Sequence, residues 1–223
     1  MNSPKYNRTL HLPWSPGKGS DDKVAKSVDS LIGVPLVITE KLDGSNVSLE
    51  RDGCYARTHA GAPTHPSFDS LKALHASVQY IIEDKVQLFG EWCYAVHSIG
   101  YTELPDYLLL FGVRYIDNDG IGKHRWGAWA ATESWAGDIG VATVPLLWVG
   151  KVSSEKELKE LTESLVYQPS TCGPNREGVV VRIATSFADK DFAQSVMKWV
   201  RKDHIQTDEH WKNQEIVKNK LKI

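Results

Sequence analysis

The sequence EKLDGSN, residues 40–46, places a lysine and a glycine turn directly after an apolar run, Val34 to Thr39, that predicts a β-strand. A lysine held where a strand enters a turn has its amine fixed in place, which suits a nucleophile better than a solvated surface lysine does. The alternative is an ordinary surface turn in which Lys41 and Asp43 are solvated. The short motif alone does not decide between the two, so the residues that follow it must.

The composition predicts one large globular domain. Hydrophobic residues make up 41% and charged residues 24% of the 223 residues, which is ordinary for a soluble protein. No apolar run approaches the ~18 residues of a membrane span, and the N-terminus lacks the apolar core of a signal peptide. The three cysteines have no metal-ligand spacing, which favours a reduced, cytoplasmic protein. The net charge of −2 provides no global positive field, so a polyanion must be bound by a local patch.

Hydrophobic periodicity predicts a mixture of strands and helices. Strands are expected at residues 35–39, 46–51, 53–58, 86–94, 107–116, 144–149, 176–183 and 192–200. Helices are expected at residues 66–84, at 127–136, from Ser154 through Leu165 with Glu157 completing a capping box, and at 208–221. Strands and helices do not alternate regularly, and no glycine-rich phosphate loop occurs. The pattern therefore favours an α+β domain of mainly antiparallel sheets over a doubly wound fold.

We expect a single domain of residues 1–223 with three parts. Residues 1–33 form an N-terminal lead segment, rich in Pro, Gly and Ser, that is either a tail or a docked arm. Residues 34–202 form the core, and residues 203–223 form a helical C-terminal tail. No separate oligonucleotide-binding or C-terminal domain is expected.

Five charged residues interrupt apolar strands or lie in tight turns: Lys41, Arg57, Glu91, Glu177 and Lys198. Each alone is explained by a surface charge or a salt bridge. Together on one concave face of a sheet, they would supply what phosphoryl transfer needs: an amine nucleophile, cations for phosphate oxygens, and carboxylates for a metal or a ribose hydroxyl.

Six segments carry a family resemblance when they are taken in order. They are EKLDGSN, ARTHAG (56–61), LFGEWCY (88–94), LLLFGVRYI (108–116), EGVVVR (177–182) and MKWVRK (197–202). They resemble the nucleotidyltransferase motifs of the ATP-dependent RNA ligases, and most closely the RNA ligase 2-like branch of the covalent nucleotidyltransferases. The resemblance runs from about residue 34 to residue 202. It implies an adenylation domain with flanking helices and an ATP cleft between its sheets.

The resemblance implies a role for each matching residue. Lys41 would attack the α-phosphate of ATP and form a lysyl–AMP phosphoramidate. Glu177 would hold Mg²⁺ or Mn²⁺, and Asn46 would help to position the RNA ends. The implied ATP- and AMP-binding residues are Glu40 near the base amino group, Leu42, Arg57, Glu91 at the ribose, Phe111 as the adenine platform, Lys198 at the α-phosphate and Lys202. From the residues alone, Phe111 is better explained as a core residue than as a platform for a base.

The sequence departs from the family pattern in two ways. Relatives often have Lys-x-Lys in the last motif, whereas Lys198 is followed by Val200, so Lys202 or Arg201 must compensate. Relatives also carry an additional domain. Its place could be taken by the N-terminal segment with Arg8, His11 and Trp14, by the basic cluster at 123–125, by the C-terminal lysines, or by a protein partner that supplies RNA specificity.

The sequence therefore predicts an ATP-dependent RNA ligase that joins 3′-hydroxyl and 5′-phosphate ends, with no membrane association. One alternative is a DNA nick ligase or a capping guanylyltransferase. Another is a nucleotide-binding module that has no catalytic activity. Against the latter, a pure binding module has no use for a nucleophilic lysine.

Overall fold

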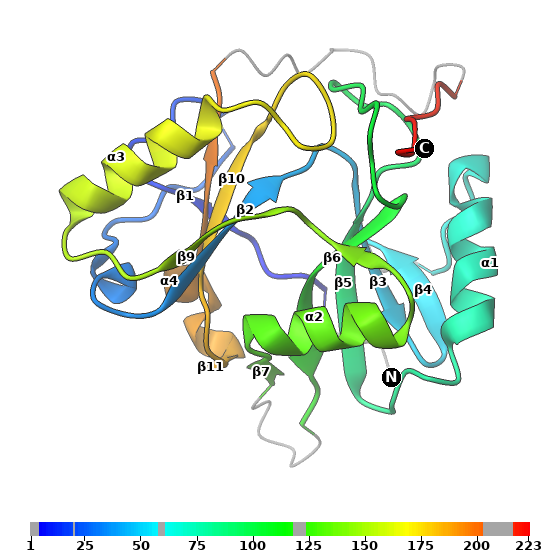
Figure 1. Ribbon diagram of the computed structural model, residues 1–223. Helices are drawn as coiled ribbons and strands as arrows, with labels where there is room; N and C mark the ends of the chain where they lie inside the picture. The colour runs from blue at the N-terminus through cyan, green and yellow to red at the C-terminus, as the bar shows by residue number, and fades with distance from the viewer. Residues whose placement is uncertain (1–4, 20, 58–60, 118–123, 203–215) are drawn as a thin grey trace.

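The computed structural model describes residues 5–19, 21–57, 61–117, 124–202 and 216–223. Its strands form two mainly antiparallel β-sheets (Figure 1). The first sheet has the order β1 (Leu10–His11), β12 (Val196–Val200), β10 (Gly178–Ile183), β2 (Leu36–Lys41) and β9 (Leu146–Gly150). The second has the order β11 (Phe187–Ala188), β7 (Arg125–Trp126), β6 (Leu108–Tyr115), β5 (Val86–Trp92), β3 (Ser45–Glu50) and β4 (Gly53–Ala56), and β8 (Ala142–Thr143) pairs with β6. The α+β fold class predicted from the sequence is confirmed.

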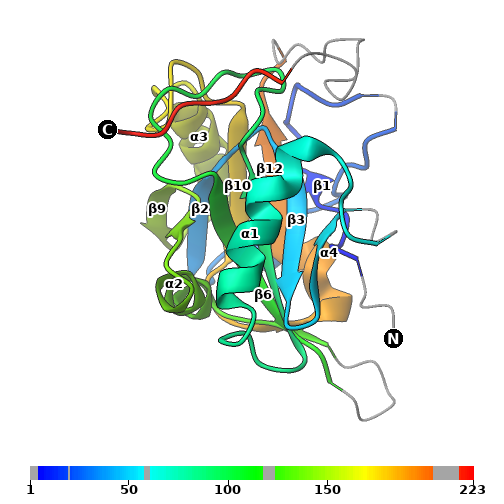
Figure 2. The same ribbon diagram turned by 90° about the vertical axis from the view of Figure 1, so that its right-hand side faces the viewer.

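Helices cover the outer faces of the two sheets. Helix α3 (Glu155–Val166) packs on the first sheet, and α1 (Asp69–Val78) packs on the second, where Figure 2 shows it in front of the strands. Helix α2 (Trp129–Asp138) packs on β6 and β8, and α4 (Phe192–Ser195) is a single turn before β12. Three short 3₁₀ helices complete the elements: η1 (Asp29–Leu31), η2 (Pro66–Phe68) and η3 (Asp189–Asp191). No helix in the described part of the chain has the length and apolar character needed to cross a membrane.

Side-chain alternation along β2 separates the core from the space between the sheets. Leu36 and Ile38 are fully buried in the cluster that includes α3. Val37 belongs instead to a cluster with Leu109 of the second sheet. Because successive side chains of a strand point to opposite faces, Thr39 and Lys41 follow Val37 onto the face between the sheets. The segment 42–44 then carries the chain from β2 in the first sheet directly into β3 in the second.

The N-terminal segment is a docked arm. We call residues 5–25, except residue 20, the N-terminal arm. Strand β1 pairs in parallel with β12, and the amide of Gly17 donates to the carbonyl of Val200 at 2.9 Å. A Cβ atom at Gly17 would lie only 2.2 Å from the carbonyl oxygen of Arg201, so this close approach requires glycine. The arm therefore covers the edge of the strand that carries Lys198.

Two predicted elements differ in the structure for local reasons. The strand expected at 192–200 begins with the helical turn α4, which the Ser195 hydroxyl closes by donating to the carbonyl of Asp191 at 2.9 Å. The helix expected at 66–84 ends at Val78, and Lys85 adopts a positive φ of 69° at the entry to β5.

The C-terminal tail corrects a third prediction. Of the helix expected at 208–221, residues 208–215 lie outside the described part, and residues 216–223 are extended rather than helical. The cause is Asn219, which is 2% exposed and whose side chain binds three backbone groups: it accepts from the Tyr101 amide and donates to the carbonyls of Cys93 and Ala95. These bonds fix the tail against the loop that follows β5.

We predict that Asn219→Ala lowers the free energy of unfolding by about 2–3 kcal/mol, because it leaves the buried Tyr101 amide and two carbonyls without their partner. Urea unfolding would measure the change. Asn175→Ala, at an exposed position, is the matched control and should have little effect. Equal effects of the two substitutions would contradict the anchoring role of Asn219.

Candidate active site

A cavity of about 570 Å³ lies between the two sheets, and the N-terminal arm forms part of its wall. Most of the residues that the sequence singles out line this cavity. They are Glu40, Lys41, Leu42, Asn46, Arg57, Glu91, Phe111 and Lys198. Residues up to 158 positions apart in the chain, from Glu40 to Lys198, are thus brought together at one cavity. They come from β2, β3, β5, β6 and β12 and from the loop after β4.

The pairing of the strands places Lys41 and Lys198 on the same face of the first sheet. Thr39 pairs with Val180 of β10, which pairs in turn with Lys198 of β12. Lys41 is two residues beyond Thr39, so its side chain points to the same side. The two amines thereby line one cavity from strands that are separated by β10.

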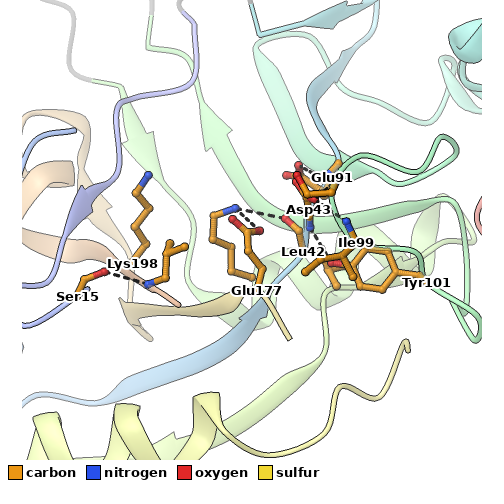
Figure 3. A network of polar contacts seen from close by, with 12 residues as sticks. Ser15, Leu42, Asp43, Glu91, Ile99, Tyr101, Glu177 and Lys198 are labelled. Atoms are coloured by element: carbon orange, nitrogen blue, oxygen red, sulfur yellow. Dashed lines mark hydrogen bonds and ion pairs between the residues drawn. The ribbon is translucent and has the colours of Figure 1, made fainter. Parts of the chain in front are cut away.

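The turn between β2 and β3 is held by polar groups of the loop that follows β5 (Figure 3). The Asp43 carboxylate accepts hydrogen bonds from the amides of Ser98 at 2.8 Å and Ile99 at 3.1 Å. The Asp43 amide donates to the Tyr101 hydroxyl at 2.8 Å. A Cβ atom at Gly44 would lie 2.7 Å from the carbonyl oxygen of Trp92, so the turn needs glycine for this close approach. Asp43 is therefore an anchor of the turn and not a solvated surface residue.

Lys41 forms a short ion pair with Glu177. Its Nζ atom lies 2.6 Å from Oε2 of Glu177, with 25% of the lysine side chain and 5% of the glutamate side chain exposed. Burial lowers the pKa of the Lys41 amine, but the carboxylates of Glu177 and Glu91 outweigh it, so the pKa lies above its ordinary value. Without a ligand Lys41 is an ammonium ion.

Glu91 is the second carboxylate near Lys41. In the view of Figure 3, Glu91 and Asp43 lie on one side of Glu177, and Lys198 lies on the other. Burial raises the pKa of Glu91 to about 8, Lys41 lowers it in part, and the negative charges of Glu177 and Asp43 raise it further. Its Oε1 atom accepts a hydrogen bond from the Gly44 amide at 3.1 Å. A carboxyl group in this position can both accept and donate hydrogen bonds near neutral pH.

Lys198 is held by the N-terminal arm. Its amine lies 3.4 Å from Asp22, whose other carboxylate oxygen lies 3.3 Å from Nε2 of His11. Burial and the Lys198 charge lower the pKa of His11 to about 4, so this imidazole is neutral at pH 7. Burial also lowers the pKa of Lys198, with a further contribution from Lys41. The sequence argument missed Asp22, because its segment has no periodicity and its partner is 176 residues away.

Glu40 is buried at the cavity wall with its charge already paired. Its carboxylate accepts a hydrogen bond from the Ser170 hydroxyl at 2.5 Å and lies 3.2 Å from Nε of Arg176. Burial raises the pKa of Glu40 even against these partners. Arg176 also donates to the carbonyls of Leu165 and Pro169 and so ties Glu40 to the loop that follows α3. The sequence argument took the charge at Arg176 only as the start of a strand.

Other predicted residues lie elsewhere. Lys202 follows the end of β12 at Val200, is exposed, and does not line the cavity. Of the basic cluster at 123–125, residue 123 lies outside the described part, and Arg125 lies over the ring of Tyr115 at 5.7 Å. Lys218 of the C-terminal tail lies over the ring of Tyr94 at 5.0 Å. Arg8 of the N-terminal arm, in contrast, lines the cavity and donates to the carbonyl of Asp21 at 2.7 Å.

The side chains around the cavity would hold a divalent cation only together with a bound ligand that supplies further oxygen atoms. Within the described residues, no group of three or more His, Cys, Asp and Glu side chains is arranged to hold a metal ion. Glu177 does not line the cavity, but its carboxylate is a hard oxygen donor 2.6 Å from the Lys41 amine, which does. Mg²⁺ is commonly bound in this way, by one or two carboxylates together with substrate phosphates and water.

Comparisons with known proteins show the family and the fold. The model of the RNA ligase family matches residues 34–200. A Naegleria gruberi RNA ligase mutant in the apo form is 16% identical with a TM-score of 0.53, over 78% of this chain and 51% of that chain. An archaeal ATP-dependent RNA ligase is 16% identical with a TM-score of 0.52, over 89% of this chain and 48% of that chain. A Naegleria gruberi RNA ligase mutant with AMP and Mn is 15% identical with a TM-score of 0.54, over 90% of this chain and 56% of that chain.

These structures show that the fold is that of the nucleotidyltransferase-type RNA ligases. The chain spans about half the length of the solved structures that it matches. No curated protein sequence matches the chain significantly.

We predict that Glu91→Gln stabilises the protein at about pH 8 and much less at about pH 5. The folded protein keeps a proton on Glu91 that the unfolded chain has released, so stability falls as the pH rises from the ordinary carboxyl range toward 8. The expected gain in Tm at the higher pH is about 2–4 °C, the shift that 1 kcal/mol produces in a domain of this size. Glu133→Gln, on the exposed face of α2, is the control. A Tm difference that is independent of pH would contradict the raised pKa.

Proposed function

The chain belongs to the RNA ligase family, and we propose that it is an ATP-dependent RNA ligase that joins 3′-hydroxyl and 5′-phosphate ends through a lysyl–AMP intermediate. The observation that carries the proposal is the Lys41 amine in the wall of a cavity, 2.6 Å from a carboxylate and on the same sheet face as a second lysine. A binding module needs no nucleophile, and a surface lysine has no such surroundings.

In the first step, Lys41 attacks the α-phosphate of ATP. Its ammonium group must first lose a proton, and Oε2 of Glu177 is the group nearest to that proton. The nitrogen lone pair then forms the N–P bond, and the bond from the α-phosphorus to the bridging oxygen breaks, so that pyrophosphate leaves with the electron pair. A lysine amine has an ordinary pKa near ~10.4, so this deprotonation is a substantial part of the barrier.

The cavity residues supply binding and charge stabilisation for this step. Lys198 and Arg57 would neutralise phosphate oxygens, and Glu91 would bind a ribose hydroxyl. Phe111 would stack on adenine, with Glu40 and Leu42 beside the base. Mg²⁺ or Mn²⁺, held by Glu177 and phosphate oxygens, would stabilise the negative charge on the α-phosphate. The Naegleria gruberi structures that contain ATP or AMP with Mn support both ligands.

In the later steps, AMP passes from Lys41 to the RNA. An oxygen of the RNA 5′-phosphate attacks the α-phosphorus and displaces the lysine amine, giving an RNA-adenylate. The 3′-hydroxyl then attacks the activated 5′-phosphorus, and AMP leaves with the electron pair. Asn46 lines the same cavity as Lys41 and is the residue we assign to the RNA ends. Arg8 of the N-terminal arm also lines this cavity and supplies a further cation for RNA phosphates.

Three further assignments belong to this proposal. The motif-bearing core at 34–202 and the docked N-terminal arm form one nucleotidyltransferase domain. A protein partner supplies additional RNA specificity, since a net charge of −2 predicts modest, salt-sensitive binding. The protein is cytoplasmic, because Cys54, Cys93 and Cys172 are all buried free thiols.

We predict that the protein becomes covalently labelled by α-³²P-ATP and not by α-³²P-GTP, in the presence of Mg²⁺ or Mn²⁺, and that Lys41→Ala abolishes the label. A denaturing gel measures this first step. A nicked RNA duplex with 5′-phosphate and 3′-hydroxyl ends should then be sealed, and the corresponding DNA duplex should be sealed at least about tenfold more slowly, the usual effect of losing one hydrogen-bonding group at a specific site.

Lys151→Ala, which removes an exposed lysine away from the cavity, is the control and should keep both activities. Labelling by GTP alone would indicate a capping-type enzyme. Preferential sealing of DNA would indicate a DNA ligase. Labelling with neither nucleotide would contradict the proposed function.

A further inference from the structure

Tyr6 of the N-terminal arm lies at the cavity, outside the segment that matches the family model. Its ring packs against aromatic residues of β5, β6 and β7 in the second sheet and of α4, which leads into β12 of the first sheet. The ring centroids lie 5.2 Å from Phe89, 5.2 Å from Phe111, 5.4 Å from Trp126 and 5.3 Å from Phe192. Tyr6 therefore closes the space between the sheets at the end of the cavity that Phe111 lines.

The arm on both sides of Tyr6 is fixed by a buried arginine. The side chain of Arg114 is fully buried and donates to Oδ1 of Asn7 at 3.0 Å and to the carbonyl of Lys5 at 3.1 Å. Removing the arm would take these two acceptors from a buried cation, which is costly. Tyr6 is consequently a fixed part of the wall and not a lid that opens.

The Tyr6 hydroxyl stays neutral. Burial raises its pKa, and the side chain of Thr9 hydrogen-bonds to it. The phenol thus keeps a fixed position and protonation state throughout the range in which an enzyme works. With Tyr6 in place, the cavity still has about 570 Å³, which is within the usual range for a small-molecule site.

The rings of Tyr6 and Phe111 meet at 73°, so that together they form a corner. A flat base stacked on the open face of Phe111 would then meet the ring of Tyr6 with its edge. Phe111 alone would fix the plane of the base but not its position within that plane. A wall at right angles supplies this second restraint.

We propose that Tyr6 is a specificity-determining residue of the nucleotide site, which closes the base end of the cavity and sets how far the purine slides across Phe111. The inference rests on the proposed function for the identity of the ligand. It adds a residue from the N-terminal arm to a site whose other residues come from the family motifs.

The test is equilibrium binding of ATP, measured by titration calorimetry in the Lys41→Arg background, which keeps a cation beside Glu177 and forms no lysyl–AMP. Tyr6→Leu should raise the Kd for ATP about tenfold or more, the size of the loss when one aromatic contact with a base is removed. Tyr6→Phe, which keeps the ring, should stay within about threefold of the parent protein. The Kd ratio of GTP to ATP should fall in Tyr6→Leu and stay unchanged in Tyr6→Phe.

Phe187→Leu is the matched control. Phe187 packs in the same aromatic cluster, against Trp126 and Phe192, but does not line the cavity. This substitution loosens the cluster without removing the wall, so the Kd for ATP should not change. An equal rise in Kd for Phe187→Leu and Tyr6→Leu, or an unchanged Kd for Tyr6→Leu, would overturn the inference.

The same titration separates this inference from the proposed function. If the Lys41-substituted protein binds ATP and the Tyr6→Leu substitution weakens this binding, the proposed role of Tyr6 is supported, even if the protein with Lys41 intact forms no lysyl–AMP. If the protein with Lys41 intact forms lysyl–AMP but Tyr6→Leu binds ATP normally, the proposed function stands and the proposed role of Tyr6 is rejected. If the Lys41-substituted protein binds no ATP, the proposed role of Tyr6 is rejected as well.

Discussion

The ion pair between Lys41 and Glu177 is the interaction on which the site depends. It joins the end of β2 to the residue directly before β10, two neighbouring strands of the first sheet. A carboxylate that is 5% exposed is strongly destabilising unless it is paired, so Lys41 and Glu177 must stay together in the ligand-free protein. The same pairing keeps the amine as an ammonium ion. The proposed nucleophile is thereby positioned but not yet reactive, and a ligand that competes for Glu177 would release it.

The turn after Lys41 connects this ion pair to the second sheet. Asp43 is fixed by amides of the loop after β5, and Gly44 donates to Glu91 on β5 itself. The C-terminal tail supports the same loop, since Asn219 binds the amide of Tyr101, whose hydroxyl holds Asp43. Support for Lys41 thus extends from the core into the C-terminal tail.

Features of the structure that depend on neighbouring residues could be predicted from the sequence, whereas those that depend on contacts between distant segments could not. Strands such as β2 and β10 were predictable, because their apolar residues form continuous local runs, and Lys41 and Glu177 were noticeable as charges at the ends of those runs. Their juxtaposition followed from the order of the motifs. The contributions of Asp22 and Tyr6 were not predictable, because both act across the fold from a segment without periodicity. The extended tail at 216–223 was missed because Asn219 acts through long-range bonds to backbone, whereas periodicity detects only local pattern.

We propose that Lys41, which is held by Glu177, accepts AMP on its Nζ atom. The most direct measurement is mass spectrometry of the protein after incubation with ATP and a divalent metal, followed by peptide mapping of the adduct. The account predicts one AMP per chain, attached to the peptide that contains Lys41 and released by acid, as a phosphoramidate should be. An adduct on Lys198, or on any residue other than Lys41, would contradict it.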